Sequence, residues 1–246
     1  MADRRLSSPL PDRVPAHLRG AWRRLSIEYG DGSGDIATTV VWLQSSRLYC
    51  DIRVPSPRPA AGARGFAGLT VEDAVALAAQ EGFAGALSVD GGRCAWERWI
   101  DYRPLGAADV GDVARAGRML VETGVDAAYV EHWWQDLHGQ DLDAADILTA
   151  AAHDPATGAI AVRAGDRVMT AIDRRPAPPP GGLAALAADA ARRRDAAGLT
   201  ALLDCEIAYG RLDGPDAWVV ELSTLPWTVG ERRILPVALR DGEAAA

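Results

Sequence analysis

Carboxylate, guanidinium and phenol side chains share one side of the segment of residues 47–54. The segment alternates, so that Tyr49, Asp51 and Arg53 point one way and four apolar side chains point the other, because successive side chains of a strand face opposite sides. Asp51 could transfer a proton while Tyr49 and Arg53 stabilise developing negative charge, or Arg53 could bind a ligand carboxylate with its planar fork. A structural ion pair between Asp51 and Arg53 explains the same pattern, and the sequence leaves both interpretations open.

A second carboxylate, Glu131, lies between aromatic residues in the segment of residues 128–136. Tyr129, Glu131 and Trp133 share one side of this segment, whereas His132 points to the other side. Burial beside an indole raises the pKa of a carboxyl group towards the range that suits a general acid or base. A hydrogen-bonded carboxylate within the core is the structural alternative.

These aromatic and charged side chains predict the lining of a pocket, because small-molecule sites combine aromatic walls with a few converging polar groups. The apolar sides of the same strands would then face outward and be covered by helices or by a partner subunit. The alternative is an apolar interior with the polar sides in solvent. We favour the polar interior, and the candidate ligand-binding residues are Arg24, Glu28, Trp42, Gln44, Trp96, Arg98, Tyr129 and Trp133.

The composition argues against several classes of function. The chain has 246 residues, a formal net charge of −8 and 26 basic residues, all of them arginine. The negative charge disfavours nucleic acid and membrane surfaces as partners, and the lack of lysine excludes Schiff-base catalysis. We expect no metal and no cofactor, because the histidines lack the spacing of a metal site and the glycines lack that of a dinucleotide-binding loop. A small-molecule ligand or substrate is the expected partner.

The cysteines and the first residues bear on the cellular compartment. Cys50, Cys94 and Cys205 lie far apart in apolar, strand-like segments, which predicts buried free thiols. Residues 1–15 lack the apolar region of a secretory signal, and no segment reaches the ~20 apolar residues of a membrane span. The sequence therefore predicts a cytoplasmic protein.

Short alternating segments predict an all-β fold with minor α structure. With about ten antiparallel strands, a single closed up-and-down β-barrel with two short helices would remove both exposed edges, whereas two small sandwiches divided at the Pro-rich stretch are the alternative. We expect a disordered lead at residues 1–16, the barrel at 17–240 with a Pro-rich connection at 174–182, and a disordered tail at 241–246. Strands are expected at residues 21–29, 38–44, 47–54, 86–89, 93–103, 118–122, 128–136, 147–152, 159–163, 167–173, 199–209, 217–225 and in the "RRILPV" segment, and helices at 70–82 and 183–197.

The tripeptide Gly20-Ala21-Trp22 stands at the start of the first predicted strand. It resembles the Gly-x-Trp motif of the calycin superfamily, which includes lipocalins, fatty-acid-binding proteins and nitrobindin-like barrels, and the chain is also similar to fungal and bacterial lipocalin-like casein-kinase-interactor proteins. The resemblance implies a lipocalin-like barrel in which the tryptophan closes the floor beneath an arginine from near the end of the chain. Arg232 or Arg233 would supply this cation here.

Trp22 also fixes the direction of its neighbours. If its indole points inward, alternation along the strand places Arg24, Ser26 and Glu28 in the interior as well. The interior of the predicted barrel is then charged.

Three functions are compatible with these patterns. The first is binding of a small, partly aromatic or amphipathic molecule inside the barrel. The second is a cofactor-free isomerase, cyclase or dehydratase that uses Glu131 or Asp51 as acid and base and Tyr49 or Arg53 to stabilise negative charge. The third is an interaction module whose apolar outer faces pair into a homodimer.

Overall fold

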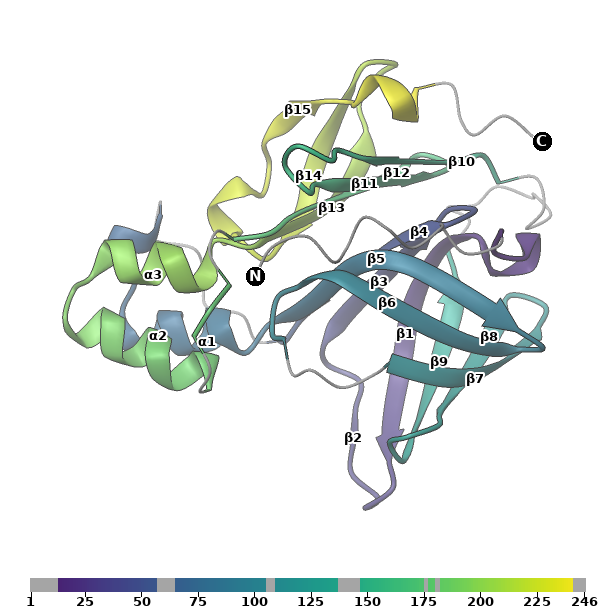
Figure 1. Cartoon of the computed structure of the whole chain (residues 1–246), viewed down its shortest axis with the longest axis horizontal. Coiled ribbons are helices and arrows are strands. Elements are labelled where there is room, and N and C mark those ends of the chain that lie inside the picture. The colour runs from purple at the N-terminus through teal and green to yellow at the C-terminus, as the bar shows by residue number, and fades with distance from the viewer. Residues whose placement is uncertain are drawn as a thin grey trace.

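Antiparallel strands dominate the structure, a computed structural model that describes residues 13–56, 65–104, 109–136, 147–174, 177–179 and 182–240 (Figure 1). Eight strands form a closed barrel in which each strand pairs with the next and the last pairs with the first. A two-residue strand, β2 (Gly34–Asp35), adds to the first of them. The eight are β1 (Gly20–Tyr29), β3 (Thr39–Gln44), β4 (Leu48–Val54), β5 (Glu81–Asp90), β6 (Arg93–Asp101), β7 (Asp109–Ala116), β8 (Met119–Gly124) and β9 (Tyr129–Gln135).

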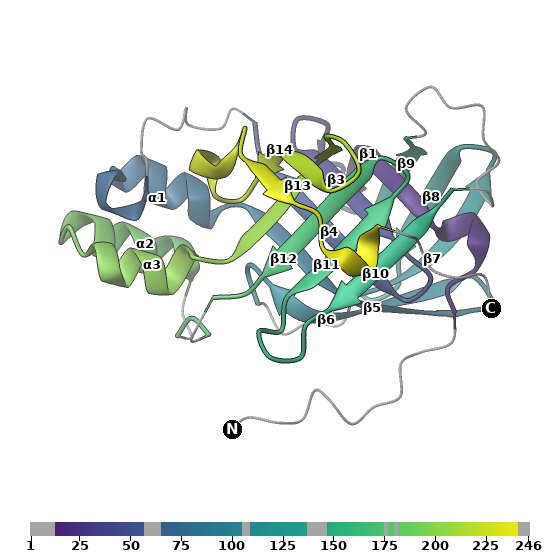
Figure 2. The ribbon, with the colours of Figure 1, turned by 90° about the horizontal axis from the view of Figure 1, so that it is seen from above.

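The remaining six strands form a second antiparallel sheet, which lies across one side of the barrel (Figure 2). All-β architecture with minor α structure is confirmed. The strands nevertheless divide between an eight-stranded barrel and a separate sheet, instead of joining one barrel of about ten strands. The second sheet consists of β10 (Thr149–His153), β11 (Ile160–Ala164), β12 (Arg167–Ile172), β13 (Glu206–Leu212), β14 (Ala217–Ser223) and β15 (Arg232–Ile234).

The second sheet covers the apolar exterior of the barrel. Cys50 and Ile52 of β4 point outward and are fully buried in a cluster with Val162 of β11 and Ile207 of β13. Removing an aliphatic side chain of this size from water contributes roughly 1.5–3 kcal/mol, so this layer contributes much of the stability. The cover predicted for this face was a set of helices or a partner subunit, and the chain supplies it with its own strands.

Three helices pack against one another beside the sheets: α1 (Val71–Ala78), α2 (Leu183–Arg192) and α3 (Ala196–Leu203). The first helix begins with the predicted capping box, in which the Thr70 hydroxyl accepts from the Asp73 amide and the Asp73 carboxylate accepts from the Thr70 amide. No described helix has the length and hydropathy needed to cross a membrane.

Several predicted segments differ from the structure. The helix predicted at residues 183–197 ends at Arg192, and a third helix, which was not predicted, begins at Ala196. The helix begun at Thr70 ends at Ala78, and β5 then starts at Glu81, five residues before the predicted strand. The strand β7 was not predicted. The strand predicted at residues 199–209 begins as the third helix, because its leucines, at helical spacing, bury against the other two helices. All three cysteines are buried and free, as predicted.

Candidate functional site

Tryptophan side chains pack against one another inside the barrel. Trp42 is the centre of the group, with its ring centroid 6.0 Å from that of Trp22, 5.9 Å from Trp96 and 5.8 Å from Trp133. Trp22 points inward and donates from Nε1 to the Leu18 carbonyl oxygen at 2.8 Å. The barrel therefore has an aromatic interior.

A network of buried ion pairs lies above these aromatic side chains. Glu131 accepts through Oε1 from Arg24 at 2.8 Å and from Arg53 at 3.3 Å. The Arg53 guanidinium also contacts Asp51 at 3.0 Å, and Arg24 contacts Asp35 at 2.9 Å. Glu131 is 1% exposed and Asp51 is 2% exposed. The polar and aromatic sides of the strands thus face the interior, which is the arrangement that we favoured from the sequence.

Glu122 of β8 was missed by the sequence reasoning. It lies directly opposite Glu131 in the pairing of β8 with β9, is 5% exposed, and accepts a hydrogen bond from the Tyr129 hydroxyl at 2.7 Å. Burial, reinforced by the charge of Glu131, raises the pKa of Glu122 to about 8. Glu122 lies two residues after Leu120, whose side chain points inward. Because every second side chain of a strand faces the same side, this spacing could have placed Glu122 in the interior.

Burial also acts on the other ionisable groups of the interior. It raises the pKa of Asp51 to about 6, against the lowering effect of Arg53. The Tyr49 hydroxyl donates to the Glu97 carbonyl oxygen at 3.5 Å, and burial raises the pKa of this phenol. Because the pKa of Glu122 is raised to about 8, its carboxyl group is mostly protonated and uncharged at neutral pH.

A β-bulge in β1 reverses the alternation after Arg24. The pairing of β1 with β9 shifts between Arg24 and Ser26, so that Ile27 points inward and Glu28 is exposed. Arg24 is in the interior as expected, but the expectation for Glu28 was wrong, because the extra residue turns the rest of the strand over.

The cation that packs on Trp22 comes from the middle of the chain. Arg115 of β7 places its guanidinium 5.5 Å from the indole centroid and donates to the side chain of Gln135 at 2.7 Å. The arginine that we expected there, Arg233, instead contacts Trp218 in the second sheet, at 5.8 Å, and pairs with Glu206. The alternative, Arg232, pairs with an exposed aspartate in that sheet.

Gln44, the remaining candidate in this part of the barrel, has a structural set of contacts. Its side chain is fully buried, accepts from the Trp42 indole at 3.2 Å and donates to the carbonyl oxygens of Ser45 and Leu48. These bonds satisfy the turn between β3 and β4.

The interior itself has little free space. A void of about 10 Å³ lies between the aromatic and charged side chains, enough for about one water molecule. Nε1 of Trp133, which lines this void, and Oε2 of Glu131 are buried without a hydrogen-bond partner among the described residues. An organic ligand needs a larger space than this.

A cavity of about 570 Å³ lies beside β6 and shares Trp96 and Asp109 with the interior void. The pairing of β6 with β7 ends at these two residues, whereas β6 continues to Asp101. The cavity lies along this unpaired half of β6 and falls within the range typical of ligand pockets. Its described lining comprises Ser88, Ala95, Trp96, Glu97, Arg98, Trp99, Asp101, Pro104, Asp109, Val110, Asp173, Ala177 and Pro178.

A second bulge shapes this part of the wall. The pairing of β5 with β6 shifts between Ala84 and Gly85, and a Cβ atom at Gly85 would lie 1.9 Å from the Glu97 carbonyl oxygen. Only glycine allows the two backbones to approach so closely. Arg98 packs over Phe83 and also contacts Asp101 and Asp109.

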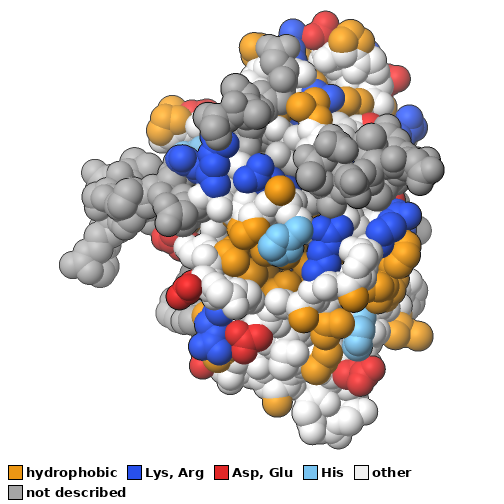
Figure 3. All heavy atoms as spheres, turned by 90° about the vertical axis from the view of Figure 1, so that its right-hand side faces the viewer, with side chains coloured by type: hydrophobic (Ala, Val, Ile, Leu, Met, Phe, Trp, Pro, Cys, Tyr) orange, Lys and Arg blue, Asp and Glu red, His pale blue; other side chains and the backbone are white. Residues whose placement is uncertain are grey.

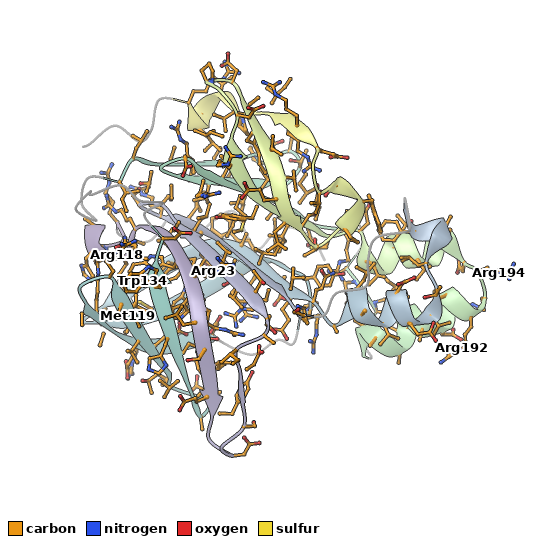
Figure 4. The ribbon with its side chains drawn as sticks, turned by 180° about the vertical axis from the view of Figure 1, so that it is seen from behind. Arg23, Arg118, Met119, Trp134, Arg192 and Arg194 are labelled. Atoms are coloured by element: carbon orange, nitrogen blue, oxygen red, sulfur yellow. The ribbon has the colours of Figure 1, made fainter. Side chains whose placement is uncertain are left out.

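The outer face of β1, β8 and β9 carries a second group of aromatic and basic side chains. Arg23 and Met119 lie on either side of Trp134 in the strand register, and the Arg118 guanidinium is 4.7 Å from the Trp134 ring (Figure 4). Trp134 is 38% exposed. Figure 3 looks onto the side of the barrel where hydrophobic, arginine and histidine side chains gather.

Comparisons with known proteins bear on the fold. No protein-family model matches the sequence, and no curated protein matches it. The structure is similar to the crystal structure of the uncharacterized protein YLR301w from Saccharomyces cerevisiae, with a TM-score of 0.52 and 10% sequence identity over 83% of this chain and 84% of that chain. At this identity the likeness concerns the fold alone.

Proposed function

We propose that the protein binds a small organic molecule in the cavity beside β6. The observation that carries this proposal is the 570 Å³ cavity itself, with two tryptophans and several charged groups in its wall. Nε of Arg98 is buried in this wall and has no hydrogen-bond partner among the described residues. Lipocalins bind their ligands inside the barrel. Because side chains fill the interior of this barrel, the proposed ligand site lies beside β6 instead.

Some interior residues predicted from the sequence keep a role in this proposal. Trp96 and Arg98 line the cavity directly, whereas Tyr49 and Asp51 lie behind Trp96 in the interior. The ion pairs of Asp51, Arg53 and Glu131 link β4 to β9 inside the barrel. None of these three residues lines the cavity.

A variant that fills the cavity tests the proposal. Ala95 lines the cavity on β6, so Ala95→Trp places an indole in the space that a ligand would occupy. Ligands found in a fragment screen by thermal shift should lose their effect in Ala95→Trp. Ile172→Trp, which adds the same side chain to a separate groove in the second sheet, is the matched control and should retain binding. Equal binding to both variants contradicts the proposed site.

An acid–base enzyme is the second candidate function. It is favoured by Glu122 and Asp51, two interior carboxyl groups whose pKa values are raised to about 8 and about 6. Conversion of a bound molecule that stops in Glu122→Gln or Asp51→Asn, with binding retained, would favour the enzyme. Recovery of every bound molecule unchanged would favour simple binding.

A homodimer through the uncovered outer face of β1, β8 and β9 is a further proposal. Trp134 and Leu25 expose 38% and 47% of their surfaces there. Sedimentation should then depend on concentration, and Trp134→Ser should abolish the dependence. Ile36→Ser, at a residue that is 83% exposed elsewhere, is the control and should leave it unchanged.

A further inference from the structure

We propose that the molecule bound beside β6 is an organic cation with an aromatic or apolar body. This inference rests on the proposed function and names the chemical class of its ligand. It follows from the charges around the cavity, from the contacts that already occupy Arg98, and from the aromatic side chains in the wall.

Carboxylates outnumber basic groups in the lining. Arg98 is the one basic side chain among the described lining residues, whereas Glu97, Asp101, Asp109 and Asp173 are acidic. Asp101 and Asp109 share the single guanidinium of Arg98, at 3.2 Å and 2.6 Å. This trio therefore carries a net negative charge, which a positively charged ligand would balance.

Glu97 adds a further negative charge to the lining. Its side chain is exposed, and the described residues provide it with no ion-pair or hydrogen-bond partner. Its carboxylate can approach a ligand cation without breaking an existing contact. Asp173, across the cavity, lies 3.9 Å from the buried Arg174 and is partly neutralised by it.

The two terminal nitrogens of Arg98 are already occupied by carboxylates. They donate to Asp101 and Asp109, and the guanidinium lies 3.7 Å from the centroid of the Phe83 ring. Only the buried Nε of Arg98 lacks a partner among the described residues, so a ligand carboxylate or phosphate could not make a two-point contact without displacing Asp101 or Asp109, and it would meet both carboxylates at close range. The electrostatics of the wall therefore oppose an anion.

The rest of the wall suits the body of an organic cation. Trp96 and Trp99 contribute to the lining, and Pro104, Val110 and Pro178 add apolar surface. Indole is the aromatic ring that attracts cations most strongly. The net charge of −8 on the whole chain adds a long-range attraction for cations.

Three matched probes test the charge preference: 2-phenylethylammonium, 2-phenylethanol and phenylacetate, titrated calorimetrically into the full-length protein at neutral pH. The ammonium ion should bind about tenfold more tightly than the alcohol, and phenylacetate more weakly than the alcohol. Glu97→Arg should reduce the affinity for the ammonium ion about three- to tenfold and leave the affinity for the alcohol within about twofold. Glu72→Arg on α1, an exposed residue, makes the same change in total charge and should have little effect.

The outcomes separate the inference from the proposed function. Equal binding of the alcohol and the ammonium ion, or tighter binding of phenylacetate, overturns the cation inference while the proposed cavity stands. Equal losses in Glu97→Arg and Glu72→Arg would assign the preference to the total charge and also overturn the inference. If none of the probes binds and the fragment screen yields no ligand sensitive to Ala95→Trp, the proposed function fails as well.

Discussion

The free energy of unfolding should fall as the pH rises from about 6 to 8, and replacing Glu122 with Gln should abolish most of this fall. Glu122 is buried opposite Glu131, and its pKa rises from an ordinary value of 4.5 to about 8. The folded state therefore keeps its proton over a range in which the unfolded state has lost it. Because the folded state binds more protons in this range, the free energy of unfolding falls as the pH rises through it.

The magnitude follows from the two pKa values. For a group with pKa 4.5 unfolded and about 8 folded, the linkage relation gives a loss of roughly 2 kcal/mol between pH 6 and pH 8. Asp51 contributes a similar slope at lower pH, because its pKa is raised from 3.8 to about 6. The range from pH 6 to pH 8 therefore isolates Glu122.

Urea unfolding at several pH values measures this slope directly. Glu122→Gln keeps the shape of the side chain and a hydrogen-bonding oxygen for Tyr129, but it cannot ionise. Its free energy of unfolding should be nearly constant between pH 6 and pH 8. Glu28→Gln, at an exposed position of β1, is the matched control and should keep the slope of the wild type. A wild-type protein without the slope, or a Glu122→Gln variant that keeps it, would refute the reasoning.

Three further predictions concern single side chains. Arg194 has φ 54° at the residue after the C-cap of α2, so Arg194→Gly should raise the free energy of unfolding by about 1 kcal/mol, and a lower stability in urea would count against it. Arg115→Ala should shift the NMR signal of the Trp22 indole N–H, whereas Arg233→Ala should leave that signal in place. The reverse result would show that Arg233, and not Arg115, packs on Trp22. Glu131→Ala leaves two buried guanidinium groups without their shared carboxylate and should cost about 3–5 kcal/mol in urea unfolding, and a cost below about 1 kcal/mol would contradict the network.

Alternation along single strands was sufficient to predict much of the interior. It placed Trp22, Asp51 and Glu131 on inward-facing sides, because one buried face specifies the register of a strand. It failed at Glu28, because the bulge after Arg24 depends on the pairing of β1 with β9, a contact that local sequence does not reveal.

Longer-range packing decided the remaining differences. The apolar run at the start of residues 199–209 fits a strand or a helix, and contacts with two other helices select the helix. Both candidate arginines for Trp22 were near the chain end, whereas the closed barrel brings Arg115 to it from a strand that was not predicted. The cavity beside β6 lies where the pairing of β6 with β7 stops, at Trp96. The point at which two strands cease to pair depends on the register of the folded sheet, which the local sequence does not reveal.

NMR signals of the tryptophan indole N–H groups, recorded while ligands from the fragment screen are added, test whether the cavity beside β6 binds a small organic molecule. The chain has eight tryptophans, and two of them line this cavity, so the signals map the site without further labels. We expect the signals of Trp96 and Trp99 to shift on titration, whereas the signal of Trp218, in the second sheet, should not. Shifts centred on Trp218, or no shift at Trp96 and Trp99 when a ligand binds, would contradict the proposed site.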